Sequence, residues 1–130
     1  MSLLLDTTIL IGIERKDKEL IKKLEAIVET DSAPANISLI TYFEFVHGLQ
    51  KKSPQNKEKS MAFIEKFAFL EATKKTAVIL SDLKYKYDKI GKPFPLADLL
   101  TASQAIENNM TLITSDKDFN EIEELKKIIL

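Results

Sequence analysis

The sequence predicts an α/β fold, a three-layer α/β/α sandwich around a central parallel sheet of four or five short strands. Short apolar runs, which are typical of strands buried on both faces, alternate with longer segments whose apolar residues recur at helical spacing. This alternation indicates parallel strands joined by helices that cover both faces of the sheet. With 130 residues and 45% hydrophobic content, the chain is sufficient for one domain, residues 1–130, with a core of its own.

Apolar runs mark the expected strands. The first strand is Leu3-Leu4-Leu5, and residues 35–38, 68–72 and 110–114 follow in chain order. The apolar residues 128–130 close the chain after a final helical turn. Right-handed crossovers place the carboxyl ends of all parallel strands at one edge of the sheet. Ligands of open α/β sheets bind at that edge.

Helices are expected between the strands, where helical periodicity agrees with capping residues and breakers. They span residues 7–14, 16–29, 39–50, 54–67, 73–90 and 96–108. Gly12 allows a neighbouring segment to approach the first helix closely, and Ser38 caps the third. Residues 31–34 break the chain after the second helix, and residues 91–95 form the loop before the last one.

Helical spacing also assigns faces to two of these helices. The helix over 39–50 carries an apolar stripe of Leu39, Tyr42, Phe43, Val46 and Leu49. The helix over 73–90 is expected to direct four side chains inward, Ala77, Leu80, Leu83 and Tyr87. Tyr42, Phe43 and Phe45 are expected in the core or in an interface with a partner, rather than stacked on bases.

Composition excludes several classes of function. Nineteen basic and twenty acidic side chains give a net charge near −1, which argues against a protein that holds nucleic acid by bulk positive charge. Cysteine is absent and His47 is the only histidine, so carboxylate oxygen remains for metal binding, and it suits Mg²⁺, Mn²⁺ or Ca²⁺. No apolar run reaches the length of a membrane span, and the N-terminus lacks a signal peptide, so we expect a cytoplasmic protein.

Four carboxylates stand out by their positions. Asp6 and Asp116 directly follow apolar strands, Asp98 lies near a helix start among apolar neighbours, and Glu44 adjoins the aromatic stripe. Each has a structural alternative, because Asp6 or Asp116 can cap a helix, Asp98 can favour a helix N-terminus, and Glu44 can be half exposed. Carboxylates gathered near one crevice repel each other, and a divalent cation relieves that repulsion. Taken together, the four acids favour a metal site over four separate caps.

The chain resembles a known family in four segments, residues 4–11, 37–49, 91–105 and 112–119. In their order and spacing these segments look like the PIN-domain ribonucleases, and most of all like the VapC-type toxins of prokaryotic toxin–antitoxin pairs. The resemblance covers essentially the whole chain. It implies an RNA substrate, a cognate antitoxin protein that holds the toxin inactive, and a homodimer.

The resemblance also implies an acidic pocket that binds Mg²⁺ or Mn²⁺ and hydrolyses RNA phosphodiester bonds with a metal-activated water. Asp6, Glu44, Asp98 and Asp116 match the four acids of the family, with Asp6 and Asp98 as direct metal ligands. Three further residues have supporting roles: Thr7, Thr114, which precedes the last acid by two, and Asp118, which can share the task of Asp116. Thr8 departs from the Asn or Ser of many relatives but keeps a hydroxyl, and with Thr7 it is expected to cap the helix and shape the pocket.

Two other functions compete with this one. A receiver-type phosphoacceptor domain would need paired acids after the first strand and an Asp after the third, where this chain has only Asp6 and the segment Phe69-Leu70-Glu71-Ala72. A catalytically inactive PIN-like scaffold would have lost some of the acids. His47 is expected to lie on the helix surface or to pack rather than to catalyse. Two lysine clusters are either solvated helix faces or contacts to RNA phosphates: Lys51, Lys52, Lys57 and Lys59, and Lys84, Lys86, Lys89 and Lys92.

Overall fold

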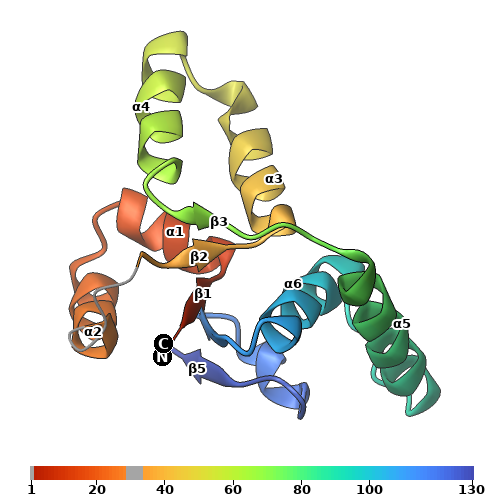
Figure 1. Ribbon diagram of the computed structural model, residues 1–130. Helices are drawn as coiled ribbons and strands as arrows, with labels where there is room; N and C mark the ends of the chain where they lie inside the picture. Colours follow the sequence, from red (N-terminus) through yellow and green to blue (C-terminus); the bar gives the residue numbers. More distant parts are fainter. Residues whose placement is uncertain (1, 29–33) are drawn as a thin grey trace.

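The computed structural model describes residues 2–28 and 34–130 (Figure 1). A five-stranded sheet in the order β3-β2-β1-β4-β5 forms its centre, and every neighbouring pair of strands is parallel. The strands are β1 (Leu3–Leu5), β2 (Asn36–Ile37), β3 (Ala68–Phe69), β4 (Thr111–Thr114) and β5 (Lys127–Ile129). The predicted parallel sheet is therefore confirmed, and the apolar end of the chain supplies its fifth strand.

Helices connect the strands in the predicted order. They are α1 (Thr7–Glu14), α2 (Lys18–Val28), α3 (Leu39–Gly48), α4 (Pro54–Ile64), α5 (Lys74–Lys89) and α6 (Leu96–Glu107), with short 3₁₀ helices η1 (Leu49–Lys51) and η2 (Lys117–Glu121). The expected end of the second helix at Glu29 and the break over 31–33 lie outside the described residues. Among the described helices, none is both long and apolar enough to cross a membrane.

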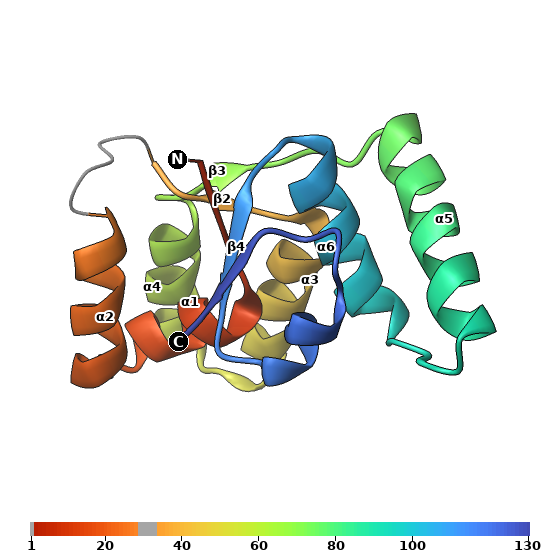
Figure 2. The same cartoon turned by 90° about the horizontal axis from the view of Figure 1, so that it is seen from below.

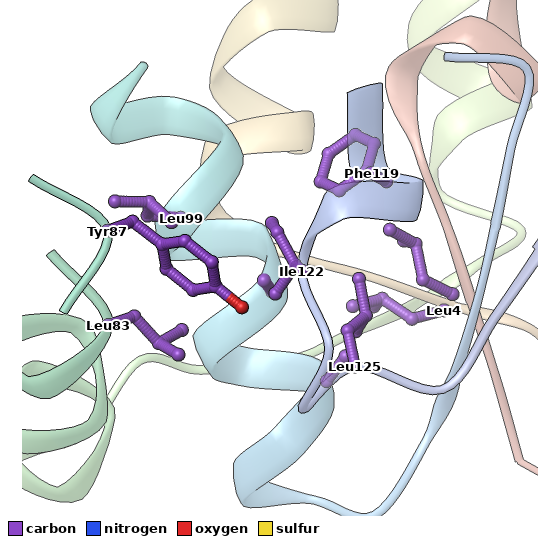
Figure 3. Close-up of a cluster of buried hydrophobic side chains, with 10 residues drawn as sticks. Leu4, Leu83, Tyr87, Leu99, Phe119, Ile122 and Leu125 are labelled. Carbon is purple, nitrogen blue, oxygen red and sulfur yellow. The ribbon is translucent and has the colours of Figure 1, made fainter. Parts of the chain in front are cut away.

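Two hydrophobic clusters, one on each face of the sheet, define the three layers. Leu4 points into a cluster with α5, α6 and the segment around η2, whereas Leu3 and Leu5 point into a cluster with α1, α3 and α4. This division follows from the alternation of side chains along a strand. Figure 2 shows the sheet between α2 and α4 on one side and α5 on the other. Figure 3 shows the first cluster, where Tyr87 and Leu83 of α5 face Leu99 of α6 and Ile122.

The orientation of α3 differs from the one that the apolar stripe suggests. Thr41 and Phe45 are the buried residues of this helix, while Phe43 is 56% and Leu39 44% exposed. Thr41 tolerates burial because its hydroxyl accepts a hydrogen bond from Ser38 Oγ at 3.1 Å. Leu39 and Phe43 of the stripe thus lie on the surface, whereas Tyr42 and Val46 are half-buried and Leu49 is buried.

The predicted inward face of α5 is wrong at one position. Leu83 and Tyr87 are buried and Leu80 is half-buried, but Ala77 is exposed and Thr76 takes the buried place one residue earlier. Thr73 and Thr76 form a capping box at the helix start, and both hydroxyls donate to the carboxylate of Glu107 in α6. These contacts to α6 hold Thr76 in the buried place that apolar spacing alone does not predict.

The turn between α1 and α2 is tight, and Gly12 makes it possible. A Cβ atom at Gly12 would lie 2.8 Å from Leu20 Cδ1, which confirms the close approach expected at this glycine. Lys16, at the turn itself, has a φ of +59°, in the left-handed region where glycine is preferred. The end of α1 lies beside α4, where Glu14 of α1 and Asn56 of α4 line one hollow.

Candidate active site

Asp6 lies where β1 gives way to α1, at the carboxyl edge of the sheet. Its backbone N–H donates to Ile113 O of β4 at 3.0 Å, so the neighbouring strand fixes its backbone. Its carboxylate is 8% exposed and accepts three hydrogen bonds: from Thr7 N at 2.7 Å, from Thr114 Oγ1 at 2.6 Å and from Thr8 Oγ1 at 3.1 Å. These donors compensate for the loss of water around a buried carboxylate.

The capping role of the hydroxyls was predicted incorrectly. Asp6 itself is the N-cap of α1, since its own side chain accepts from the backbone of Thr7. Thr7 instead donates its hydroxyl to Glu44 Oε1 at 2.7 Å and so joins α1 to α3. Thr8 accepts from Ser115 N at 3.1 Å while donating to Asp6, a bridge between α1 and the end of β4 that sequence reasoning missed.

Thr114 and Asp116 continue the network at the end of β4. Thr114 is fully buried, and its hydroxyl donates to Asp6 while it accepts from Asp116 N at 3.0 Å. Asp116 is the N-cap of η2 and accepts from Asp118 N at 2.9 Å, so its capping alternative is correct as well. A continuous chain of hydrogen bonds therefore joins Glu44, Asp6, Asp116 and Asp118 through Thr7 and Thr114.

Asp98 enters the site from the first turn of α6. Burial of its carboxyl group, together with the negative charges of Asp116, Asp6, Glu44 and Asp118, raises the pKa of Asp98 to about 6. The charges of Asp116, Asp6, Glu44 and Asp118 all act on the Asp98 carboxyl group. The structure therefore places the four predicted acids and Asp118 near one another. The first turn of a helix favours a carboxylate, yet this helix end does not offset the field of the other acids.

Burial of the five acids is uneven. Asp6 is buried, Asp98 and Asp116 are half-buried, and Glu44 and Asp118 are exposed. Glu44, which adjoins the aromatic stripe in the sequence, is therefore an exposed residue that the Thr7 hydroxyl holds in place. The five carboxylates form a cluster of negative charge at the carboxyl edge of β1 and β4, which we call the acidic cluster.

The chemistry of this donor set fits a hard divalent cation. Mg²⁺ takes oxygen ligands, keeps several waters and is held through one or two carboxylates. Within residues 2–28 and 34–130, no three acidic side chains lie close enough together to ligate one ion directly. A site in which one or two carboxylates bind the ion and the rest act through water suits that arrangement. Excess negative charge around Asp98 is what such an ion would neutralise.

His47 and the aromatic residues of α3 stand apart from the acids. The His47 ring stacks on Phe43 with 5.6 Å between the ring centroids, on the exposed face of the helix. The predicted packing role of His47 is consistent with this contact. Phe45 is buried in the core and tilted against Phe63.

The sheet order, the helices on both faces and the acids at the carboxyl edge together describe one class of protein. The chain belongs to the PIN domain family, whose family model matches residues 3–125. It is 26% identical to Ribonuclease VapC2 of Rickettsia felis over 129 residues, which covers 98% of this chain and 92% of that protein.

Two solved structures show the same arrangement of the chain. A VapBC2 complex from Rickettsia felis bound to a DNA fragment from its promoter gives a TM-score of 0.86 at 25% identity, covering 100% of this chain and 99% of the other. A toxin–antitoxin complex from Klebsiella pneumoniae gives a TM-score of 0.76 at 27% identity, covering 95% of each chain. The chain is thus similar to VapC-type toxins over nearly its whole length.

Proposed function

We propose that this protein is a metal-dependent ribonuclease that hydrolyses RNA phosphodiester bonds, and that it is the toxin of a toxin–antitoxin pair. The observation that carries the proposal is the meeting of five carboxylates at the carboxyl edge of β1 and β4. Hydrogen bonds through Thr7 and Thr114 join Glu44, Asp6, Asp116 and Asp118 there, and the pKa of Asp98 beside them is raised to about 6. An acidic cluster of this kind would repel a phosphodiester unless a cation neutralised it. Similarity to a curated ribonuclease over 98% of the chain supports the same activity.

Asp6 and Asp98 are the proposed direct ligands of Mg²⁺ or Mn²⁺, with Glu44 and Asp116 acting directly or through water, and Asp118 beside them. A bound ion would polarise a phosphoryl oxygen and lower the pKa of a water molecule, whose oxygen would bond to phosphorus as the bond to the leaving sugar oxygen breaks. The protein fixes the geometry: the hydroxyls of Thr8 and Thr114 and the N–H of Thr7 hold the Asp6 carboxylate in one orientation. Thr7 orients Glu44 through its 2.7 Å hydrogen bond.

The two competing functions are weaker on these observations. A receiver-type domain needs an acceptor Asp after the third strand. Here β3 is followed by Leu70, which has no carboxylate and whose backbone N–H donates to Ile37 O at 2.9 Å. In an inactive scaffold, five carboxylates close to one another would destabilise the fold by repulsion without serving a reaction. We also propose a cytoplasmic location for this protein, where RNA is available as a substrate.

Cleavage of RNA tests the activity. Purified protein should cut a labelled single-stranded RNA with Mg²⁺ or Mn²⁺ and should stop when EDTA is added. Asp98→Asn should lose about 100-fold or more in rate, because removal even of a group that only orients a metal ligand costs about 10- to 100-fold. Asp82→Asn, which removes an exposed carboxylate of α5, is the matched control and should cleave like the wild type. Equal rates for Asp98→Asn and the wild type would contradict the proposal.

An antitoxin and a second copy of the chain are the proposed protein partners. One similar structure is a toxin–antitoxin complex, and another is VapBC2 bound to a DNA fragment from its promoter. For the second copy, the exposed apolar side chains of α3 are a candidate contact surface, because patches of this kind mark interfaces.

A further inference from the structure

A groove runs along α1 from the acidic cluster. It is an open hollow of about 400 Å³ between α1 and α3, and it begins at Thr7 and Glu44, the pair that joins these helices. Ile11, Arg15 and Lys52 line it farther from the acids. With a rise of about 1.5 Å per residue, α1 carries the groove roughly 12 Å from Thr7 to Arg15. The groove therefore connects the site with the only arginine of the chain.

A second hollow continues the first one between α1 and α4. Its volume is about 550 Å³, and it shares Glu14 and Lys52 with the groove beside the acids. Lys16, Asn56 and Lys59 line this second part. In Figure 1, α4 and α3 rise on the same side of the sheet above α1, which is where such a groove has to run.

Across the two hollows together, cations outnumber anions. Arg15, Lys16, Lys52 and Lys59, which we call the basic track, line the two hollows, and the acids that line them are Glu14 and Glu44. Glu14 is paired with Lys52 at 3.2 Å, and Lys52 also donates to the buried Ser60 hydroxyl at 3.1 Å, so Lys52 is held in place. The track is a local excess of positive charge on a chain whose net charge is −1.

Lys16 lies at the end of α1. Its φ of +59° places a lysine at a helix end where glycine or asparagine is favoured. The position brings a cation to the junction of α1 and α4, where glycine would bring none.

From these observations we infer that the basic track binds backbone phosphates of single-stranded RNA next to the bond that is cut. The inference rests on the proposed ribonuclease function and adds to it which residues hold the substrate. Arg15 offers a planar fork suited to a phosphate, and the lysines add point charges. Ile11 and Phe63 line the two hollows and give bases an apolar surface between the cations. The residues of the track are binding residues, and none of them takes part in the chemical step.

Paired substitutions of equal charge test the inference. Arg15→Gln with Lys59→Gln removes two cations from the track, and Lys74→Gln with Lys75→Gln removes two exposed cations from α5, on the other side of the molecule. Binding of a fluorescein-labelled RNA oligonucleotide is measured in the Asp98→Asn background with Mg²⁺, so that the probe stays intact. The track variant should bind about tenfold more weakly, and its slope of log Kd against log salt should fall by about 1.4, roughly 0.7 for each lost phosphate contact with a single strand.

Kinetics in the active protein provide a second measurement. The track variant should raise KM about tenfold and leave kcat within about twofold, because lost binding that is equal in ground and transition states appears in KM. Arg15→Lys with Lys59 intact should recover most of the affinity, and thermal unfolding of each variant confirms that it is folded.

Three outcomes would contradict parts of this picture in distinguishable ways. If the track variant and the α5 control bind RNA alike while the wild type cleaves it, the track is wrong and the proposed function stands. If the wild type binds RNA through the track without cleaving it, the inference stands and the nuclease does not. If the track variant loses affinity for poly-L-glutamate but not for RNA, the track binds an acidic polypeptide and the inference fails.

Discussion

Asp98 is the residue on which the charges of the site converge. Its pKa is raised to about 6 by burial first and by Asp116, Asp6, Glu44 and Asp118 next, whereas Asp6, equally part of the site, is surrounded by donors. A raised pKa means that the folded protein binds this proton more tightly than the unfolded chain does. The contribution of Asp98 to stability is therefore present at low pH and is lost as pH rises from about 4 to about 6.

Asp98→Asn should accordingly stabilise the metal-free protein at neutral pH. Compared with the wild type, we expect a gain of about 1 to 2 kcal/mol in the free energy of unfolding at pH 7, after allowance for screening, and a difference near zero at pH 4. Urea unfolding in EDTA at both pH values measures it, with Asp82→Asn as the control. Saturating Mg²⁺ should reverse the order, because an ion that binds only the folded wild type stabilises it. A loss of several kcal/mol in Asp98→Asn would instead mark Asp98 as a structural hydrogen-bond partner.

At the scale of elements, the contacts between helices decide which residues are buried. α1 carries most of this organisation, because it starts at the Asp6 cap, reaches α3 through Thr7 and packs closely on α2 at Gly12. The hydroxyl of Thr41 and the capping box at Thr76 show that polar side chains set helix orientation as strongly as apolar ones. Both positions are buried with their hydrogen bonds made, so neither carries the cost of an unpaired hydroxyl.

Two glycines in helices should respond differently to alanine and valine. Gly48, where an added Cβ meets nothing within 4 Å among the described atoms, should gain about 0.5 to 1 kcal/mol as Gly48→Ala, because alanine loses less backbone entropy. Gly12→Ala gains the same preference but must displace the Leu20 side chain, so we expect a net change within about 1 kcal/mol of zero. Gly12→Val, with more atoms to place, should lose about 1 to 3 kcal/mol.

Chemical denaturation of the three glycine variants gives the comparison directly. Gly12→Val as stable as the wild type would show that α1 and α2 separate without cost. A Gly48→Ala variant less stable than the wild type would show that an added methyl group at this position meets other atoms.

At the scale of the whole molecule, charge and apolar surface are separated. The acids gather at one edge of the sheet, and the basic track lies along α1. Leu39, Phe43, Val46 and His47 line a shallow hollow of about 300 Å³ on α3 that contains none of the five acids. This hollow is the proposed contact between two copies.

Phe43→Glu should break the proposed homodimer. Phe43 is 56% exposed and stacks on His47, so a charge in its place adds no strain to the monomer but would be buried unpaired in an interface. Sedimentation velocity at micromolar concentration should give a dimer for the wild type and a monomer for Phe43→Glu. Gln55→Glu, which adds the same charge on an exposed residue of α4, should remain dimeric. A monomeric wild type, or a dimeric Phe43→Glu, would contradict this assignment.

Local patterns determined much of the fold and site. The strands were predictable because short apolar runs bounded by polar residues have few other uses, and the acids because carboxylates at strand ends are conspicuous among apolar neighbours. The bounds of α1 were predicted to the residue, since a cap and a helix end border them directly. The acids could be grouped because parallel strands end at one edge.

Only the tertiary structure decided how those acids are held. Hydrogen bonds from Thr7 to Glu44 and from Thr114 to Asp6 join residues 37 and 108 positions apart, and no local pattern encodes such pairs. The exposure of Leu39 and Phe43 on α3 was likewise decided by the packing of the helix, which buries Thr41 and Phe45. The sequence by itself determined which residues are acidic, where strands end and that a parallel sheet unites them, because these depend on near neighbours. Which residues are buried, and how strongly the carboxylates repel one another, depends on how close segments far apart in the sequence come to lie. Only the folded structure sets those distances.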